Sequence, residues 1–248
     1  MCVHKSPVSW DGPQLALKED VFFCLSEGQG IFLDLAQDDY SAIPIPERDS
    51  CSGGHLSDEE LCVVLEPYRS ELIEAGLITD TEARAPGFQS YRAIVRPVGH
   101  IFGEDDQRAF GLPDRSGASR RISSADVVGF AWASWRARRL LKTRHIRDVV
   151  RAVRMRKARA VMYAKTDHAL QQHVAIFRKL RPWFPASYLC LYDALALIEF
   201  LALKNLFPTW VFGVQAQPFG AHCWLQSGDE LLNESREYAG QFTPIMAV

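Results

Sequence analysis

The chain has 248 residues, of which 48% are hydrophobic and 23% are charged, and its formal net charge is −2. This composition is typical of a globular protein with a sizeable core, and it excludes a disordered or collagen-like chain. No apolar run approaches the roughly 18 residues of a membrane span, and the N-terminal sequence lacks the basic and apolar regions of a signal peptide. We therefore expect a cytoplasmic protein of one or two domains with no membrane partner.

The small net charge conceals a difference between two parts of the chain. Residues 1–80 carry 4 Lys and Arg against 16 Asp and Glu, a net charge of −12, whereas residues 81–248 carry 24 against 14, a net charge of +10. This asymmetry favours two modules with different tasks, although a drift in surface composition would also produce it. The six cysteines include no CxxC pair, which favours free thiols in a reducing compartment over a disulfide framework, a zinc site or any other metal site.

Residues 1–84 are predicted to form a first domain of strands followed by helices. Short runs rich in β-branched and aromatic residues, separated by turn sequences, predict a small sheet with strands at 21–25, 30–35 and 40–43.

A helical pattern follows the three strands. Ser57 and Glu60 have the spacing of a capping box at its beginning. Pro67 is expected to break or restart the helix, and Gly76 is expected to end it.

Residues 85–122 are predicted to be a linker, with a possible strand at 91–102, and residues 123–248 a second domain. Between Arg136 and Arg159 the chain has eleven Lys and Arg against one acidic residue. A patch that binds nucleic acid or phosphate is conceivable, but a solvated helix face is favoured and no nucleic-acid partner is expected. The apolar seam beneath that face would consist of Val149, Val150, Val153 and Met155.

The second domain reads as helices followed by strands. Ser123 or Ser124 can cap a helix to about residue 143, and further helices are expected at 145–159, 167–180 and 188–207, the last of them apolar nearly all round. Strands are expected at 209–219, 221–226, 230–234 and 242–248. The whole chain is therefore assigned to the α+β class.

Cys190 lies in the first turn of the apolar helix, three residues after Ser187, which could cap it. A helix N-terminus carries partial positive charge and free N–H groups, so it lowers the pKa of a thiol and can hold an oxyanion. A cysteine in an apolar helix is more often simply buried. Cys190 is thus a candidate nucleophile that needs a partner.

The candidate partner is His222 in "AHCWLQ". Side chains alternate along a strand, so His222 and the adjacent Cys223 point to opposite faces and Cys223 cannot easily serve His222. The return strand supplies a residue to orient the imidazole. A two-residue loop pairs Trp224 with Asn233 and places Ser235 opposite His222, whereas a three-residue loop places Glu234 opposite His222. A polar residue is within reach in either register, and the choice between Asn233 and Glu234 remains open.

A helix-start Cys, a strand His and a polar residue on the next strand follow the order found in papain-like and transglutaminase-like enzymes. The stretches "RPWFPASYLCLYDALALIEFLA", "FGVQAQPFGAHCWLQSGDELLNE" and "FTPIMAV" resemble the transglutaminase-like cysteine proteases that mature lasso peptides in bacteria. The resemblance implies that Cys190 is the nucleophile and His222 the base. The Asp of that family falls on Glu234, preceded by Asn233.

The N-terminal stretches "GIFLDLAQDDYSAIP" and "LIEAGLI" resemble small winged-helix-type domains that recognise leader peptides. Such domains bind the leader as an added strand beside a helix. The resemblance implies an edge strand formed by Tyr40, Ser41, Ala42 and Ile43, and a helical wall that includes Leu72 and Leu77.

Together the two resemblances imply a cysteine peptidase that removes the leader from a lasso-peptide precursor. An ATP-dependent cyclase of the asparagine-synthetase-like type is the implied partner. No phosphate-binding GxxxxGK[ST] loop is present, so no bound cofactor is expected and any need for ATP would belong to the complex. Two rival hypotheses remain: a transglutaminase-like acyl transferase that uses an amine acceptor, and a non-catalytic leader-binding scaffold.

Overall fold

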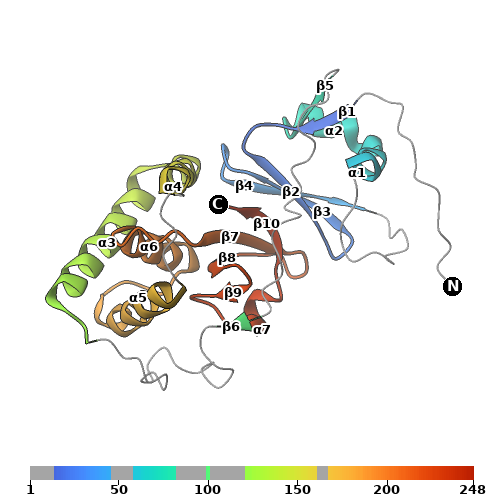
Figure 1. Ribbon diagram of the computed structural model, residues 1–248. Helices are drawn as coiled ribbons and strands as arrows, with labels where there is room; N and C mark the ends of the chain where they lie inside the picture. The colour runs from blue at the N-terminus through green and yellow to red at the C-terminus, as the bar shows by residue number, and fades with distance from the viewer. Residues whose placement is uncertain (1–13, 46–57, 82–98, 101–120, 161–166) are drawn as a thin grey trace. The chain divides into compact units, whose positions relative to one another are not determined.

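The computed structural model describes residues 14–45, 58–81, 99–100, 121–160 and 167–248 (Figure 1). The chain divides into two units. One comprises residues 1–94 with the short segments 214–220 and 243–246, and the other comprises the remaining residues. Strands and helices occur in both, which confirms the α+β class.

The N-terminal unit contains a three-stranded antiparallel sheet in the order β2-β3-β4. Its strands are β2 Val21–Ser26, β3 Gln29–Asp34 and β4 Asp39–Pro44, close to the predicted runs. Glu27 and Gly28 form the β2–β3 turn with φ values of 50° and 75°, as a two-residue hairpin loop requires. The sequence did not reveal a second, two-stranded sheet, in which β1 Gln14–Leu17 pairs with β5 Ile78–Thr81.

The predicted helix is divided at Pro67, as expected. Helix α1 Asp58–Leu65 leads into the 3₁₀ turn η1 Glu66–Tyr68, and α2 Arg69–Glu74 follows. Gly76 lies just beyond α2 with a φ of 71°, a conformation that favours glycine at a helix end. Ser57 and the side chain of Glu60 lie outside the described part of the chain, so the capping box stays a prediction.

One hydrophobic core joins the sheets and helices of this unit. Apolar residues from the β strands meet residues from α1 and α2 in a single buried cluster. Its members are Leu15, Val21, Phe32, Cys62, Leu65, Leu72, Leu77 and Ile78.

The C-terminal unit has a helical layer in which α3 and α5 pack against α6 (Figure 1). Ser123 caps α3 in a capping box with Asp126. Phe130 of α3, Phe177 of α5 and Phe200 of α6 meet with ring centroids 5.3 to 6.5 Å apart, which fixes α6 between its neighbours. The helices are α3 Ser124–Thr143, α4 Ile146–Ala160, α5 Asp167–Leu180 and α6 Cys190–Ala202.

Five strands form a sheet in the order β10-β7-β8-β9-β6. They are β6 Gly99–His100, β7 Thr209–Gln215, β8 Gly220–Ser227, β9 Glu230–Leu231 and β10 Thr243–Ala247. Strand β6 pairs with β9 in parallel and lies inside the sequence assigned to the linker. Most of the predicted linker 85–122 lies outside the described residues, so the boundaries of the two predicted domains stay predictions.

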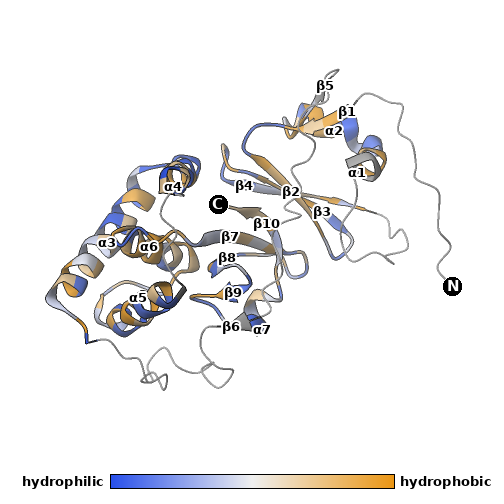
Figure 2. Cartoon of the chain, viewed as in Figure 1, coloured by the Kyte–Doolittle hydropathy of each residue, from blue (hydrophilic) through white to orange (hydrophobic). Residues whose placement is uncertain are grey.

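Some basic side chains of α3 and α4 bind a buried carboxylate. Glu199 of α6 is 1% exposed and binds Arg136 of α3 at 2.8 Å and Arg156 of α4 at 2.6 Å. Lys157 donates to the Thr209 hydroxyl at 3.1 Å. Some of the hydrophilic residues coloured blue on α4 in Figure 2, such as Arg156 and Lys157, therefore bind other parts of the protein.

Three local expectations need correction or refinement. Ser187 does not cap α6, because the helix begins at Cys190 itself with Leu189 as the N-cap. Met155 does not join the apolar seam, because its side chain is 55% exposed, whereas Val149, Val150 and Val153 are buried. The expected strand at 230–234 ends after Leu231.

Among the described residues, no helix combines the length and apolarity that crossing a bilayer requires.

Candidate active site

Cys190 is the first residue of the buried helix α6, and its side chain is half-buried. The N–H group of Asp193 makes the first helical bond, to the Leu189 carbonyl at 2.9 Å. The N–H groups that precede it at the helix start have no acceptor within the helix. The Cys190 thiol therefore lies where backbone dipoles favour a negative charge.

His222 lies on β8 with one ring nitrogen held by a carboxylate. Its Nε2 is 2.8 Å from Glu234 Oε2, and the other carboxylate oxygen of Glu234 accepts the N–H of Ser235 at 2.8 Å. The Nδ1 atom is thus left to face Cys190, with which His222 also forms a hydrogen bond. A carboxylate that fixes the ring and its tautomer in this way is the usual partner of a histidine base.

Aromatic rings enclose the imidazole. The Tyr238 ring lies edge-on to it with centroids 4.9 Å apart, the Phe242 ring is tilted at 5.1 Å, and the Trp224 ring is stacked at 6.1 Å. These rings restrict the orientations of His222 and reduce the access of water to its bond with Glu234. Tyr238 and Phe242 were not singled out from the sequence. Tyr238 lies between the stretches that resemble known proteases, and Phe242 begins the stretch "FTPIMAV" but is not of a residue type considered for catalysis.

In the structure, the length of the hairpin loop does not decide whether Glu234 contacts His222. Gln226 pairs with Leu231 and Ser227 with Glu230, so Gly228-Asp229 is a two-residue loop. Gly228 has a φ of 59°, as the first loop position of a type II′ turn requires. If β9 continued in this register, Glu234 would not lie opposite His222. The strand ends early instead, and the chain bends so that Glu234 reaches the ring.

Asn233 has a different contact. Its side-chain oxygen accepts the Leu225 N–H at 2.7 Å, and the Leu232 N–H donates to the Leu225 carbonyl at 2.9 Å. The Asn233 side chain thereby replaces the backbone group that a longer β9 would have supplied. Of the two residues that the sequence left open, the structure places Glu234 against His222 and Asn233 against β8.

Cys223 approaches Cys190 from the strand. Its N–H points to the same side as that of Leu225, two residues on, toward the edge where β9 has ended. Both its backbone N–H and its thiol donate hydrogen bonds to Cys190. Alternation correctly separates Cys223 from His222, but the two residues meet the same sulfur atom, which sequence reasoning missed.

These contacts favour a thiolate at Cys190. Hydrogen bonds from the Cys223 thiol and from His222 lower the pKa of Cys190 to about 4, and the positive charge of His222 acts in the same direction, against the effect of burial. Burial raises the pKa of Cys223 well above its usual range, so this second thiol stays neutral and able to donate.

The same contacts favour a protonated His222. Burial by itself lowers the pKa of His222, but hydrogen bonds to Cys190 and Glu234 and the negative charges of these groups together raise it to about 9. Between these two values the site holds a thiolate beside an imidazolium, an arrangement that can attack a carbonyl carbon and protonate a leaving group. Because the two groups interact strongly, they titrate as a pair.

The residues expected to bind a leader are divided between surface and core. Tyr40, Ser41, Ala42 and Ile43 lie on β4, which forms an outer strand of its sheet and is half-buried or exposed throughout. Leu72 and Leu77 belong to the buried core cluster, so in this structure their side chains face the interior. The range 72–77 also includes Ile73, which is 39% exposed.

Among the described residues, no group of three or more His, Cys, Asp or Glu side chains gathers as metal ligands would.

Comparison with known families agrees with the geometry at α6 and β8. A family model described as "Transglutaminase-like superfamily" matches residues 124–247, which include Cys190, His222 and Glu234. Searches of curated proteins and of solved structures gave no match. The matched segment covers half of the chain and contains all of the helices α3 to α6 and the strands β7 to β10. The chain therefore belongs to the transglutaminase-like superfamily.

Proposed function

We propose that this protein is a cysteine peptidase that removes the leader peptide from a lasso-type precursor. The observation that carries the proposal is the hydrogen-bonded series of Cys190, His222 and Glu234, with the thiol at the start of α6. Membership of the transglutaminase-like superfamily supports cysteine-based acyl chemistry. The sequence resemblance to lasso-peptide proteases supports the choice of substrate.

In the first half of the reaction, the Cys190 thiolate attacks the carbonyl carbon at the junction of leader and core. The negative charge that develops on the oxygen is stabilised by N–H groups at the start of α6. The C–N bond then breaks, and His222 gives its proton to the departing core amine. The leader remains attached to Cys190 as a thioester.

In the second half, the neutral His222 accepts a proton from water, which attacks the thioester carbonyl. The C–S bond breaks, the leader departs with a free carboxylate, and Cys190 returns to the thiolate. Glu234 holds the imidazole in place through both halves and stabilises its charged form.

The N-terminal unit is the proposed leader-binding part. An extended leader adds to the edge of the sheet at β4, where Tyr40 to Ile43 present backbone groups to a partner strand. The freed core amine then passes to an ATP-dependent cyclase of the asparagine-synthetase-like type, which closes the macrolactam. The charge of −12 over residues 1–80 favours leaders that carry basic residues.

The test uses the full chain and a lasso-type precursor peptide, followed by mass spectrometry. We expect free leader and free core with masses that add up to the precursor plus one water, and no cleavage by the folded Cys190→Ala variant. Cleavage by that variant at the parental rate would overturn the proposal. So would an intact precursor after incubation with the parent protein, the cyclase and ATP.

The same experiment separates hydrolysis from acyl transfer. A primary amine is added as a competing acceptor, and the leader is examined for a mass increase that corresponds to an amide. Leader with a free carboxylate as the main product supports a peptidase. Quantitative conversion to the amide at low amine concentration would instead assign the protein to the acyl transferases.

A further inference from the structure

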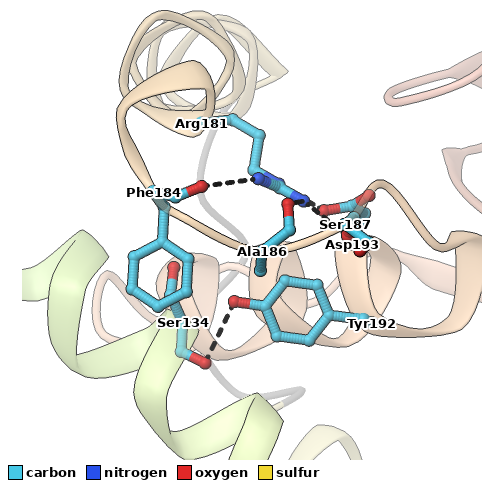
Figure 3. Close-up of polar contacts among 7 residues, drawn as sticks. All are labelled: Ser134, Arg181, Phe184, Ala186, Ser187, Tyr192 and Asp193. Carbon is cyan, nitrogen blue, oxygen red and sulfur yellow. Dashed lines mark hydrogen bonds and ion pairs between the residues drawn. The ribbon is translucent and has the colours of Figure 1, made fainter.

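A buried arginine organises the segment that precedes Cys190. Arg181 begins the 3₁₀ turn η3 Arg181–Trp183 and is 2% exposed. Its Nη1 donates to the Phe184 carbonyl at 3.3 Å, and its Nη2 donates to the carbonyls of Ala186 at 3.2 Å and Ser187 at 3.1 Å (Figure 3). One guanidinium thus binds the carbonyl groups of three residues in the loop between η3 and α6.

The same guanidinium is attached to the helix that carries the thiol. Its Nε donates to the Asp193 carboxylate, three residues after Cys190 and within the first turn of α6 (Figure 3). It also lies 4.2 Å from the centre of the Tyr188 ring and 5.5 Å from that of Tyr192. Arg181 therefore connects the loop on one side of Cys190 to the helical turn on the other.

The loop depends on this arginine because it has little regular structure of its own. Leu189, the N-cap of α6, makes no side-chain capping bond. Within the loop, the Ala186 N–H donates to the Phe184 carbonyl, but the carbonyls of Ala186 and Ser187 point to Arg181. A planar fork of five donors suits such convergent acceptors, and lysine cannot reproduce it.

Arg181 also balances a charge near the thiol. The Asp193 carboxylate lies close enough to Cys190 for its negative charge to oppose the thiolate. Arg181 binds this carboxylate directly, so it offsets that repulsion while it holds the loop.

We propose that Arg181 is a positioning residue for Cys190. By fixing the loop and the first turn of α6 together, it keeps the thiol within hydrogen-bond reach of His222 and Cys223. The inference rests on the proposed role of Cys190 as the nucleophile, but it can be tested without the precursor, because the reactivity of the thiol can be measured directly.

The test is the pH dependence of Cys190 alkylation by iodoacetamide, followed by peptide mass spectrometry so that the other cysteines do not interfere. Only the thiolate reacts, and at pH 5, one unit above the parental pKa of about 4, nearly all of the Cys190 thiol is ionised. A tenfold lower rate at pH 5 therefore corresponds to an acid limb moved up by about two pH units. We expect Arg181→Gln to lower the alkylation rate at pH 5 by about tenfold or more. With a precursor, kcat falls while KM changes little.

Arg136→Gln is the matched control. Arg136 also binds a carboxylate of α6, but that carboxylate is Glu199, nine residues after Cys190 and so about 13 Å further along the helix. We expect a lower melting temperature for this variant and a parental alkylation profile. Equal shifts of the acid limb in Arg181→Gln and Arg136→Gln would mean general loosening of α6 and would overturn the proposal.

Two further variants separate positioning from folding. Asp193→Asn removes the negative charge near the thiol, but its amide oxygen can still accept from Arg181 Nε and the three loop contacts of Arg181 remain. Its acid limb should therefore not move up, and a rise equal to that of Arg181→Gln would overturn the proposal. Arg181→Lys keeps the charge without the fork and is the variant to use if the Gln variant does not fold. It should show a partial loss of reactivity, and a fully parental profile would overturn the proposal.

Failure of the parent protein to cleave a precursor would count against the proposed function alone.

Discussion

Replacing Glu234 by Gln tests the orientation of His222 most directly. The amide has nearly the same shape and can still accept a hydrogen bond from Nε2, but it has no negative charge. The His222 side chain is 9% exposed and that of Glu234 is 22% exposed, so solvent screens their 2.8 Å contact only in part. The substitution therefore removes charge and little else.

The size of the effect follows from this geometry. Two unit charges about 4 Å apart interact by about 4 kcal/mol at an effective dielectric constant of 20, which sets an upper bound. Measured hydrogen bonds to charged groups contribute about 1.5–3 kcal/mol. Since about 1.4 kcal/mol corresponds to one pH unit, loss of the charge should move the alkaline limb of activity, near pH 9 in the parent, down by about one to two pH units.

The assay is kcat/KM for precursor cleavage between pH 4 and 10, together with NMR titration of His222. Asn233→Ala is the matched control, because Asn233 is the adjacent residue and accepts the Leu225 N–H without contacting the imidazole. We expect it to lower stability and to leave the alkaline limb in place. A parental limb in Glu234→Gln, or an equal shift in Asn233→Ala, would refute the assignment of Glu234.

Three other predictions concern the thiol and the helix that carries it. The plot of activity against pH should be a broad bell, because Cys190 becomes protonated as the pH falls through about 4 and His222 loses its proton as the pH rises through about 9. A profile with an optimum outside these limits would contradict the ion pair. Cys223→Ala should move the acid limb of the Cys190 alkylation profile to higher pH because a donor to the thiolate is lost. Cys223→Ser, which keeps a donor, should return the limb most of the way to its parental position. Unchanged alkylation kinetics in the alanine variant would show that the donor is unimportant. Glu199→Ala should lower the free energy of unfolding by about 3 kcal/mol in urea titrations, because two arginines lose a buried partner, and a loss below about 1 kcal/mol would be evidence against this role.

Local patterns in the sequence were sufficient to predict much of the fold. The runs at 21–25, 30–35 and 40–43 alternate or are bounded by turn residues, and each became a strand. Pro67 divides a helix because a ring without an N–H cannot continue it, wherever the rest of the chain lies. Features of this kind depend on neighbours within a few residues, so the sequence displays them directly.

Pairings between distant segments were missed for a physical reason. Strand β1 pairs with β5 more than sixty residues later, and each strand has only four residues. Runs so short have no periodicity of their own, and their pairing depends on a core assembled from the whole unit. Arg181 was missed for the same reason, since its acceptors are loop carbonyls, which any residue could supply.

The choice between Glu234 and Asn233 depended on a feature that hairpin rules do not include. Both predicted registers require that the return strand continues opposite His222, so that loop length alone selects the partner. In the structure the loop has two residues, but β9 ends after Leu231. Asn233 then completes the last bonds of the ladder with its side chain, and Glu234 is free to turn toward the imidazole.

The early end of β9 also explains how two residues with opposite orientations can serve one sulfur. A full return strand would occupy the edge of β8 and accept the N–H of Cys223. Because β9 stops, that N–H remains available to Cys190, while the His222 ring on one face and the Cys223 thiol on the other both reach the sulfur at the edge. Strand alternation therefore does not exclude Cys223 from the site. It places the two donors on either side of a sulfur atom that lies at the edge of the strand.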